Sequence, residues 1–359
     1  MTPSAGLPAS QRSAFLLGPE RLEIREVPVE RPAAGELLVA IGAATTCGTD
    51  VKVFRRGGHP RMLRVPTPFG HEMAGTVAAV GAGTSRFREG DRVAIANSAP
   101  CGRCRACRRG HENLCADLHY LNGAFAEYLL VPPRFVERSV YPCPAALPFE
   151  LAALAEPLAC VLHGLEALEL GLDPDAPRDV ALFGSGPIGL LWVDLLSRRG
   201  HRVVAVDPNP SRLEIARRLG AAATVAVGRD GGEAARVLQE LGPESPVGGF
   251  DVAVEATGSP TTWKDAVDVV APGGLALLFG GYPPATAVPL DAHRLHYCEL
   301  TLKGAYHHRP ATFARALDLL ASGDLDPRAL LSAELPLAQV EDALRRMMRR
   351  EALKVVIRP

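Results

Sequence analysis

The stretch from residue 179 to residue 199 most strongly constrains the fold of this chain. It reads DVALF, then GSGPIG, and then an apolar helical pattern. Gly184, Gly186 and Gly189 have the spacing G-x-G-x-x-G between the strand and the helix. Here the first glycine permits a tight turn and the third lets the helix pack closely on the strand. Apolar side chains at i, i+3, i+4, i+7 and i+8 line one face of the helix, so we expect that face to pack on a sheet.

The same alternation of strand and helix continues toward the C-terminus. VVAVD, ATVAV, DVAVEATG, GGLALLFGG and ELTLKGAY read as further strands. We expect helices over Pro187–Arg199, Ser211–Leu219 and residues 231–241. Six strands that alternate with helices predict a parallel, doubly wound α/β sheet from about Val180 to about Cys298.

The N-terminal part reads as short strands punctuated by glycine up to about Tyr128. This pattern predicts a barrel-like all-β block. Because 359 residues are too many for one ordinary core, we expect two domains. The β domain takes residues 12–155 and 299–359, with the last strand, KVVIRP, returning to it. The sheet domain takes residues 156–298.

Composition and charge exclude several classes of protein. The 39 Lys and Arg residues balance 40 Asp and Glu residues, so the net charge of −1 gives no electrostatic reason to expect a nucleic-acid partner. No secretory signal is readable at the N-terminus, and Glu156 and Pro157 interrupt the most apolar long run, so we expect no membrane span. A cytoplasmic location is therefore expected. In that compartment clustered cysteines bind metal rather than form disulfides.

The glycine-rich turn also predicts a dinucleotide site, because the N–H groups at the start of the helix face an approaching pyrophosphate. Asp207 ends the second strand eighteen residues after Gly189. A carboxylate there accepts hydrogen bonds from the adenosine ribose and repels a 2′-phosphate, which favours NAD over NADP. Arg212 leaves NADP open. The predicted cofactor-binding residues are Gly184, Gly186, Pro187, Ile188, Gly189, Asp207, Arg212, Phe279, Gly280 and Gly281.

Four of the eight cysteines fall within residues 101–115, and they are Cys101, Cys104, Cys107 and Cys115. Their spacing, C-x2-C-x2-C-x7-C, lets four thiolates close around one tetrahedral Zn²⁺ with no position left for a substrate. A redox centre needs one reactive thiol and a partner instead. A DNA-binding finger would be followed by a recognition helix. The loop therefore predicts a structural zinc site.

A second, dispersed set of residues suggests a catalytic metal site. Cys47 lies in TTCGTD, His71 and Glu72 lie in PFGHEMAG, and Glu156 lies in AEPLAC. One thiolate, one imidazole and one carboxylate neutralise Zn²⁺ and leave a fourth position open. Adjacent side chains of a regular strand point to opposite faces, so His71 and Glu72 both bind the metal only if the backbone turns there. Otherwise Glu156 supplies the carboxylate.

Several motifs in one order resemble the zinc-dependent medium-chain dehydrogenase/reductase family over nearly the whole chain. They are CGTD, GHEMAGTVAAVG, GDRVA, the four-cysteine loop, EPLACVLHG, GSGPIG with VDPN, and KVVI. The GHE and EPLA forms resemble the sorbitol, iditol and threonine dehydrogenase branch. The resemblance implies a GroES-like β-barrel, a Rossmann sheet, and a homodimer or homotetramer. It also implies that Cys47, His71 and Glu72 bind the catalytic zinc, with Glu156 behind them or exchanging with them.

The resemblance further implies a reaction. The zinc lowers the pKa of a substrate hydroxyl, Thr49 relays the proton toward the nicotinamide ribose, and a hydride passes to NAD⁺. Many relatives end this relay at a histidine where this chain has Lys52. A lysine can take that role only with a lowered pKa, so Lys52→Ala is expected to depress turnover at neutral pH. Asp50 is expected to brace the cysteine loop.

The leading hypothesis is an oxidoreductase with two zinc ions per chain. It acts with NAD on a secondary alcohol of a polyol, a sugar derivative or a hydroxy amino acid. Two alternatives remain, an oxidoreductase of primary alcohols and aldehydes, and a zinc-binding structural protein without turnover. Specificity depends on side chains whose positions the sequence leaves undefined, so it does not name the substrate.

Overall fold

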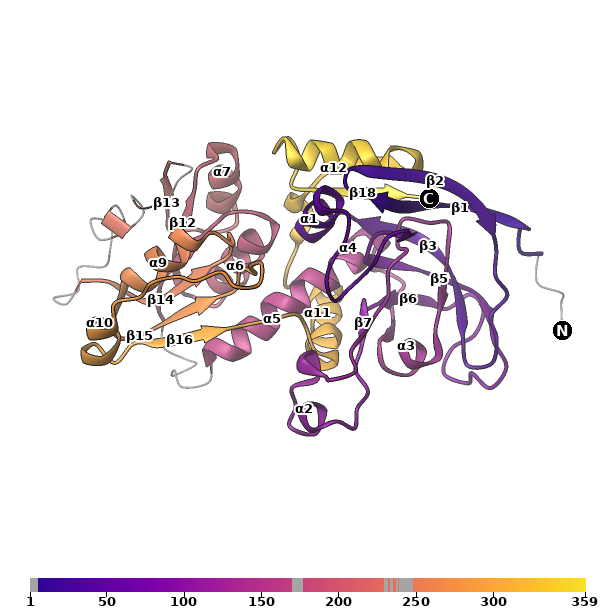
Figure 1. Ribbon diagram of the computed structural model, residues 1–359, viewed down its shortest axis with the longest axis horizontal. Coiled ribbons are helices and arrows are strands. Elements are labelled where there is room, and N and C mark those ends of the chain that lie inside the picture. Colours follow the sequence, from indigo (N-terminus) through magenta and orange to yellow (C-terminus); the bar gives the residue numbers. More distant parts are fainter. Residues whose placement is uncertain (1–5, 170–176, 229–231, 233–234, 237, 239–247) are drawn as a thin grey trace. The chain divides into compact units, whose positions relative to one another are not determined.

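The computed structural model describes residues 6–169, 177–228, 232, 235–236, 238 and 248–359 (Figure 1). The chain forms two compact units, one from residues up to Ala159 together with His308–Pro359, and one from Cys160–His307. The first boundary lies inside helix α5 (Ala155–Glu169), close to the expected position. The second lies nine residues beyond the expected one, because strand β16 (Thr301–Gly304) pairs with the sheet of the second unit.

The first unit contains two main sheets. The smaller has the order β2-β1-β4, with bounds Arg21–Pro28, Ser10–Gly18 and Thr67–Pro68. The larger has the order β10-β6-β5-β3-β18-β17, with β9 (Tyr128–Val131) also on β3. Its bounds are Val140–Pro142, Arg92–Ile95, Glu72–Val80, Leu37–Thr45, Lys354–Arg358 and Leu331–Pro336. The last strand, β18, pairs antiparallel with β3, so the C-terminus returns to this unit as the sequence predicts.

Strands β3 and β5 form the centre of the larger sheet. Their side chains join one apolar core that includes Leu37, Val39 and Met73. A Cβ at Gly75 would lie 2.1 Å from the carbonyl oxygen of Ala40, so only glycine permits this close pairing. The two strands thereby meet where β3 ends and β5 begins.

The second unit contains one parallel sheet with the order β13-β12-β11-β14-β15-β16. The first five strands span Ala223–Ala226, Arg202–Asp207, Asp179–Phe183, Phe250–Glu255 and Val270–Leu278. This confirms the predicted doubly wound sheet. The chain order reverses between β11 and β14, which is where such sheets bind dinucleotides.

Helices α6 (Pro187–Arg198) and α7 (Pro210–Arg218) agree with the predicted helices to within one residue. The predicted helix over 231–241 lies largely outside the described residues. In the described chain no helix is both long and apolar enough to cross a membrane. The remaining α-helices are α1 (Gly48–Arg56), α2 (Arg105–Arg108), α3 (Pro133–Arg138), α4 (Phe149–Ala153), α9 (Pro260–Asp268), α10 (Ala292–Tyr297), α11 (Pro310–Ser322) and α12 (Val340–Met348).

Candidate active site

Three of the predicted metal ligands lie together in the first unit, where β3 ends and β5 begins. The Cys47 Sγ, a ring nitrogen of His71 and a carboxylate oxygen of Glu72 all lie within 4.8 Å of one another. We call this set the Cys47 cluster. His71 lies just before β5, which begins at Glu72, so the strand rule that separates neighbouring side chains does not apply to this pair. The two neighbours can therefore serve one metal ion.

Asp50 holds two members of the Cys47 cluster in place. Its Oδ2 accepts the backbone N–H of Cys47 at 2.9 Å, and its Oδ1 lies 2.8 Å from Nδ1 of His71. A carboxylate only accepts hydrogen bonds, so Nδ1 donates and Nε2 is the nitrogen left for a metal. Burial lowers the pKa of His71, but the Asp50 charge and hydrogen bonds outweigh it and hold that pKa well above 6.5. A metal would therefore displace a proton here.

A buried lysine shares the carboxylate of Glu72. Lys354 Nζ lies 2.8 and 2.6 Å from the two carboxylate oxygens, and it donates to the carbonyl of Thr46 at 2.7 Å. Thr45 Oγ1 also donates to Glu72. Glu72 is fully buried and Lys354 is 1% exposed. Lys354 was not predicted as a site residue from the sequence. Its one signal was a charged residue that opens the apolar last strand.

Glu156 lies outside the Cys47 cluster but close enough to interact with it electrostatically. Burial raises the pKa of Glu156 to about 7, with the His71 charge opposing and the Glu72 charge adding to the shift. Among the described residues its carboxylate lies 3.9 Å from His308 Nε2. His308 Nε2 also lies 2.9 Å from Oδ1 of the buried Asn97. Glu156 thus remains a candidate for an exchanging ligand.

The two predicted relay residues lie in different surroundings on helix α1. The Thr49 backbone N–H donates to Cys47 Sγ at 3.4 Å, so this residue adjoins the cluster directly. Lys52 is exposed on the same helix and makes no hydrogen bond or ion pair with the described residues. The proton relay through Lys52 stays a prediction.

The four clustered cysteines point at one centre. Their sulfur atoms lie within 4.8 Å of one another. The backbone N–H of Cys101 donates to Cys115 Sγ at 3.2 Å, and that of Cys104 donates to Cys101 Sγ at 3.3 Å. N–H groups of Cys107 and Ala116 lower the pKa of Cys104 to about 6, whereas burial raises the pKa of Cys107 to about 12. Four thiolates together therefore need a cation, and the donor set fits zinc.

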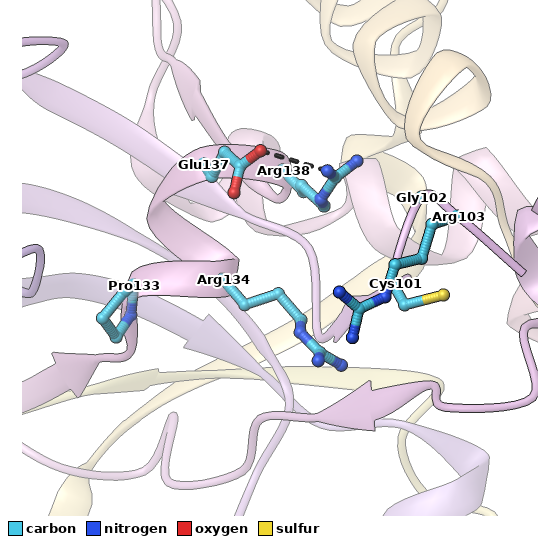
Figure 2. Close-up of a pocket in the computed structure, with 7 residues that line it drawn as sticks. All are labelled: Cys101, Gly102, Arg103, Pro133, Arg134, Glu137 and Arg138. Atoms are coloured by element: carbon cyan, nitrogen blue, oxygen red, sulfur yellow. Dashed lines mark hydrogen bonds and ion pairs between the residues drawn. The ribbon is translucent and has the colours of Figure 1, made fainter.

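A basic cavity of about 420 Å³ lies beside this loop and is separate from the Cys47 cluster (Figure 2). Arg103, Arg134 and Arg138 line it together with Cys101. Arg134 pairs with Asp117 at 2.8 Å, and Arg138 pairs with Glu137 at 3.1 Å. Because Asp117 and Glu137 already compensate Arg134 and Arg138, Arg103 is the remaining positive charge of the cavity beside the four cysteines.

The glycine-rich turn of the second unit has the geometry that a dinucleotide site needs. Gly184 has φ of +95°, in the left-handed region that favours glycine. A Cβ at Gly189 would lie 1.7 Å from the Gly184 carbonyl oxygen, so helix α6 packs against the turn only with glycine there. At Gly186 the nearest atom to an added Cβ is Arg212 Nη1, at 3.9 Å, which leaves room for a phosphate. Gly184 and Gly189 therefore fit the roles expected of them, and Gly186 leaves the open space that a phosphate needs.

Asp207 is buried at the carboxyl end of β12 and faces this turn. Its two carboxylate oxygens accept the backbone N–H groups of Ser185 and Asn209, both at 2.8 Å. The carboxylate thus ties the glycine-rich turn to the end of the neighbouring strand.

The other predicted cofactor-binding residues directly follow β15. Phe279 packs edge-on against Trp192, with ring centroids 5.9 Å apart. Gly280 donates its N–H to Glu255, a residue that the sequence analysis did not name.

Comparison with known proteins assigns the chain to a family. Two family models match it, the alcohol dehydrogenase GroES-like domain over residues 33–143 and the zinc-binding dehydrogenase over residues 187–322. The chain is 31% identical over 363 residues to sorbitol dehydrogenase from Bacillus subtilis (strain 168), with 98% of each protein covered. The chain belongs to the zinc-dependent medium-chain dehydrogenase/reductase family.

Two further relatives of this zinc-dependent dehydrogenase support the assignment. L-threonine 3-dehydrogenase from Idiomarina loihiensis is 32% identical over 339 residues, which cover 92% of this chain and 94% of that protein. A zinc-binding dehydrogenase from Sinorhizobium meliloti 1021, solved with NADP, has a TM-score of 0.86 at 29% identity and covers 98% of this chain and 100% of that chain. The predicted family branch, fold class and zinc- and NAD(P)-dependent oxidoreductase class are confirmed.

Proposed function

We propose that this dehydrogenase transfers a hydride between NAD and a secondary alcohol of a polyol, a sugar derivative or a hydroxy amino acid. The observation that carries the proposal is the Cys47 cluster, in which three ligand atoms of the right types lie within 4.8 Å. The names of the two sequence relatives, sorbitol dehydrogenase and L-threonine 3-dehydrogenase, support the substrate class. Each of these substrates carries its hydroxyl on a secondary carbon beside other polar groups.

Cys47, His71 and Glu72 would hold the catalytic zinc, with Glu156 as the exchanging carboxylate. The zinc would supply a Lewis acid that lowers the pKa of a substrate hydroxyl. Asp50 keeps His71 in the tautomer that presents Nε2 to the metal. Lys354 compensates part of the Glu72 charge, so the three protein ligands present less than their formal charge of −2.

Thr49 is the proposed first acceptor of the substrate proton, because its backbone lies directly against Cys47. From there the proton leaves toward solvent, and Lys52 at the exposed surface of α1 is the proposed last residue of the proton relay. The turn from Gly184 to Gly189 and the first turn of α6 would bind the pyrophosphate of the dinucleotide. Phe279, Gly280 and Gly281, after β15, belong to the same edge.

NAD is the proposed cofactor form, because the Asp207 carboxylate at the end of β12 repels a 2′-phosphate. Arg212, whose guanidinium lies 3.9 Å from a Cβ position on Gly186, is the residue that would favour NADP instead. A homodimer or homotetramer is the proposed assembly. The proposed compartment is the cytoplasm, since thiolate-rich zinc sites need reducing conditions.

A substrate panel tests the proposal. The zinc-loaded enzyme is mixed with NAD and, separately, with sorbitol-like polyols, sugar acids, threonine-like amino alcohols and primary alcohols, and NADH absorbance is followed. Turnover of secondary alcohols well above that of primary alcohols is expected. Preference for primary alcohols would support the alternative enzyme class. Absence of turnover with NAD and with NADP across the panel, in protein that carries two zinc ions per chain, would contradict the proposal.

A further inference from the structure

A buried carboxylate links the loops at the cofactor edge of the second unit. Glu255 is the last residue of β14 and is fully buried. Its Oε1 accepts the backbone N–H groups of Thr257 at 2.7 Å and Gly258 at 2.8 Å, and also the Thr257 hydroxyl at 2.5 Å. Its Oε2 accepts the backbone N–H of Gly280 at 3.2 Å, and this N–H also donates to the Glu255 backbone carbonyl at 3.1 Å. Glu255 therefore holds the loop after β14 through its side chain, and the loop after β15 through its side chain together with its backbone carbonyl.

The same loop also contacts the glycine-rich turn. A Cβ at Gly184 would lie 2.7 Å from Thr257 Cγ2, so the threonine methyl group rests directly on that turn. A Cβ at Gly280 would lie 2.4 Å from the backbone nitrogen of Gly258, which shows how closely the two later loops approach. Three loops that follow β11, β14 and β15 thus meet around Glu255.

The loops that meet around Glu255 lie at the edge of the sheet where a dinucleotide binds. The order of the strands reverses between β11 and β14, and dinucleotides bind outside the carboxyl ends of strands at such a reversal. A cofactor there touches the backbone of the loops, whose positions depend on what anchors them. We propose that Glu255 is a positioning residue for the dinucleotide, which it serves by holding these loops in the binding arrangement. The inference rests on the proposed function.

A carboxylate suits this role better than any neutral side chain. The four donors face two oxygens, and an ionised carboxylate can accept all of them. A glutamine has one oxygen and one NH2 group. In Glu255→Gln at least one N–H of the loops would face an N–H of the side chain, so one loop would move. The chain fold of the second unit would persist, because its core lies between the strands and helices rather than at this edge.

The test compares Glu255→Gln with a matched control on the same strand. Asp251 is the second residue of β14, at the opposite end from Glu255, and its Oδ2 accepts the backbone N–H of Asp179 at 2.9 Å. Asp251→Asn removes the same charge and disturbs the same kind of hydrogen bond, away from the cofactor edge. The dissociation constant of NADH is measured by its fluorescence in the zinc-loaded enzyme, well below the thermal midpoint of each variant. The KM for NAD, the kcat and the thermal midpoint are measured in parallel.

Glu255→Gln is expected to weaken NADH binding on the order of tenfold or more, the effect of losing charge-assisted hydrogen bonds. The KM for NAD rises, whereas the kcat at saturating NAD changes less. Asp251→Asn keeps the parent dissociation constant even where its thermal midpoint falls. If Glu255→Gln does not fold, Thr257→Val, which replaces the hydroxyl that donates to Glu255 by a methyl group, takes its place and is expected to weaken NADH binding by a smaller factor.

Two results would overturn the inference. One is a folded Glu255→Gln variant that binds NADH as tightly as the parent does, and the other is an equal loss of affinity in Asp251→Asn. If only Thr257→Val can be measured, an unchanged NADH affinity overturns it. Failure of the proposed function is distinguishable, because the unmodified enzyme would then bind neither NADH nor NADPH or would turn over no alcohol.

Discussion

Replacing Lys354 by methionine removes the only lysine that contacts Glu72 among the described residues. The substitution keeps most of the volume of the side chain and takes away its charge. In the structure the ammonium lies 2.8 and 2.6 Å from the Glu72 carboxylate oxygens and 2.7 Å from the Thr46 carbonyl. In the variant Glu72 would be a buried carboxylate whose remaining side-chain donor among the described residues is the Thr45 hydroxyl.

The magnitude follows from the burial of both partners. Breaking a buried ion pair by removing one partner costs about 3–5 kcal/mol, because the other charge is left uncompensated. The matched control is Lys303→Met, since Lys303 donates to the carbonyl of Ala167 at 2.8 Å and pairs with no carboxylate among the residues that the structure describes. Loss of one such hydrogen bond costs about 1 kcal/mol. The double variant Lys354→Met/Glu72→Gln is expected to be more stable than Lys354→Met alone, because it no longer buries the unpaired charge.

The assay is chemical denaturation of protein stripped of its catalytic zinc, followed by far-ultraviolet circular dichroism. Tryptophan fluorescence gives an internal control, because Trp192 and Trp263 both lie in the second unit. That transition should stay unchanged in Lys354→Met. In zinc-loaded protein the loss of stability should be smaller, since the metal then compensates Glu72. A loss in Lys354→Met no larger than in Lys303→Met, with no recovery in the double variant, would refute the reasoning.

Three further predictions concern the metal sites and the glycine-rich turn. Cys104→Ser is expected to lose the structural zinc and much of its thermal stability, and Cys47→Ser is expected to lose the catalytic zinc and keep its fold. The zinc content per chain, measured by atomic absorption, checks both variants. The assignment of the two sites is contradicted if neither variant retains one zinc per chain. Asp50→Asn should weaken catalytic zinc binding about 10- to 100-fold, measured by competition with a chelator, and unchanged affinity would exclude the bracing role. Gly189→Ala should destabilise the second unit by about 1–3 kcal/mol, whereas Gly186→Ala should keep the parent melting curve and bind NADH more weakly; equal melting curves for the two would contradict the geometry.

The fold of the second unit was predictable because its determinants are local. The turn from Gly184 to Gly189 needs a left-handed residue and a close helix contact, and both requirements appear in the sequence as glycines at fixed spacing. Strand and helix periods then define the alternation. The strand ELTLKGAY, which contains β16, was also predicted, but the domain boundary was placed before it. The sequence pattern does not indicate in which domain a strand at the edge of the sheet is counted.

The candidate active site was predictable in its residues but only partly in its geometry. Spacing alone left open whether His71 and Glu72 face one centre, and the answer depends on where β5 begins. Lys354 lies 282 residues from Glu72 in sequence, so no local pattern links the two. Glu255 was missed because an acidic residue at a strand end has many roles. Its four donors come from the loops after β14 and β15, and only the folded structure brings these loops together.

X-ray diffraction of zinc-loaded crystals at the zinc absorption edge tests the central claim most directly. The account predicts two anomalous peaks per chain. One lies among the sulfur atoms of Cys101, Cys104, Cys107 and Cys115, and the other lies within bonding distance of Cys47 Sγ and His71 Nε2. A single peak at the four cysteines, with no metal between Cys47 and His71 in excess zinc, would contradict the account.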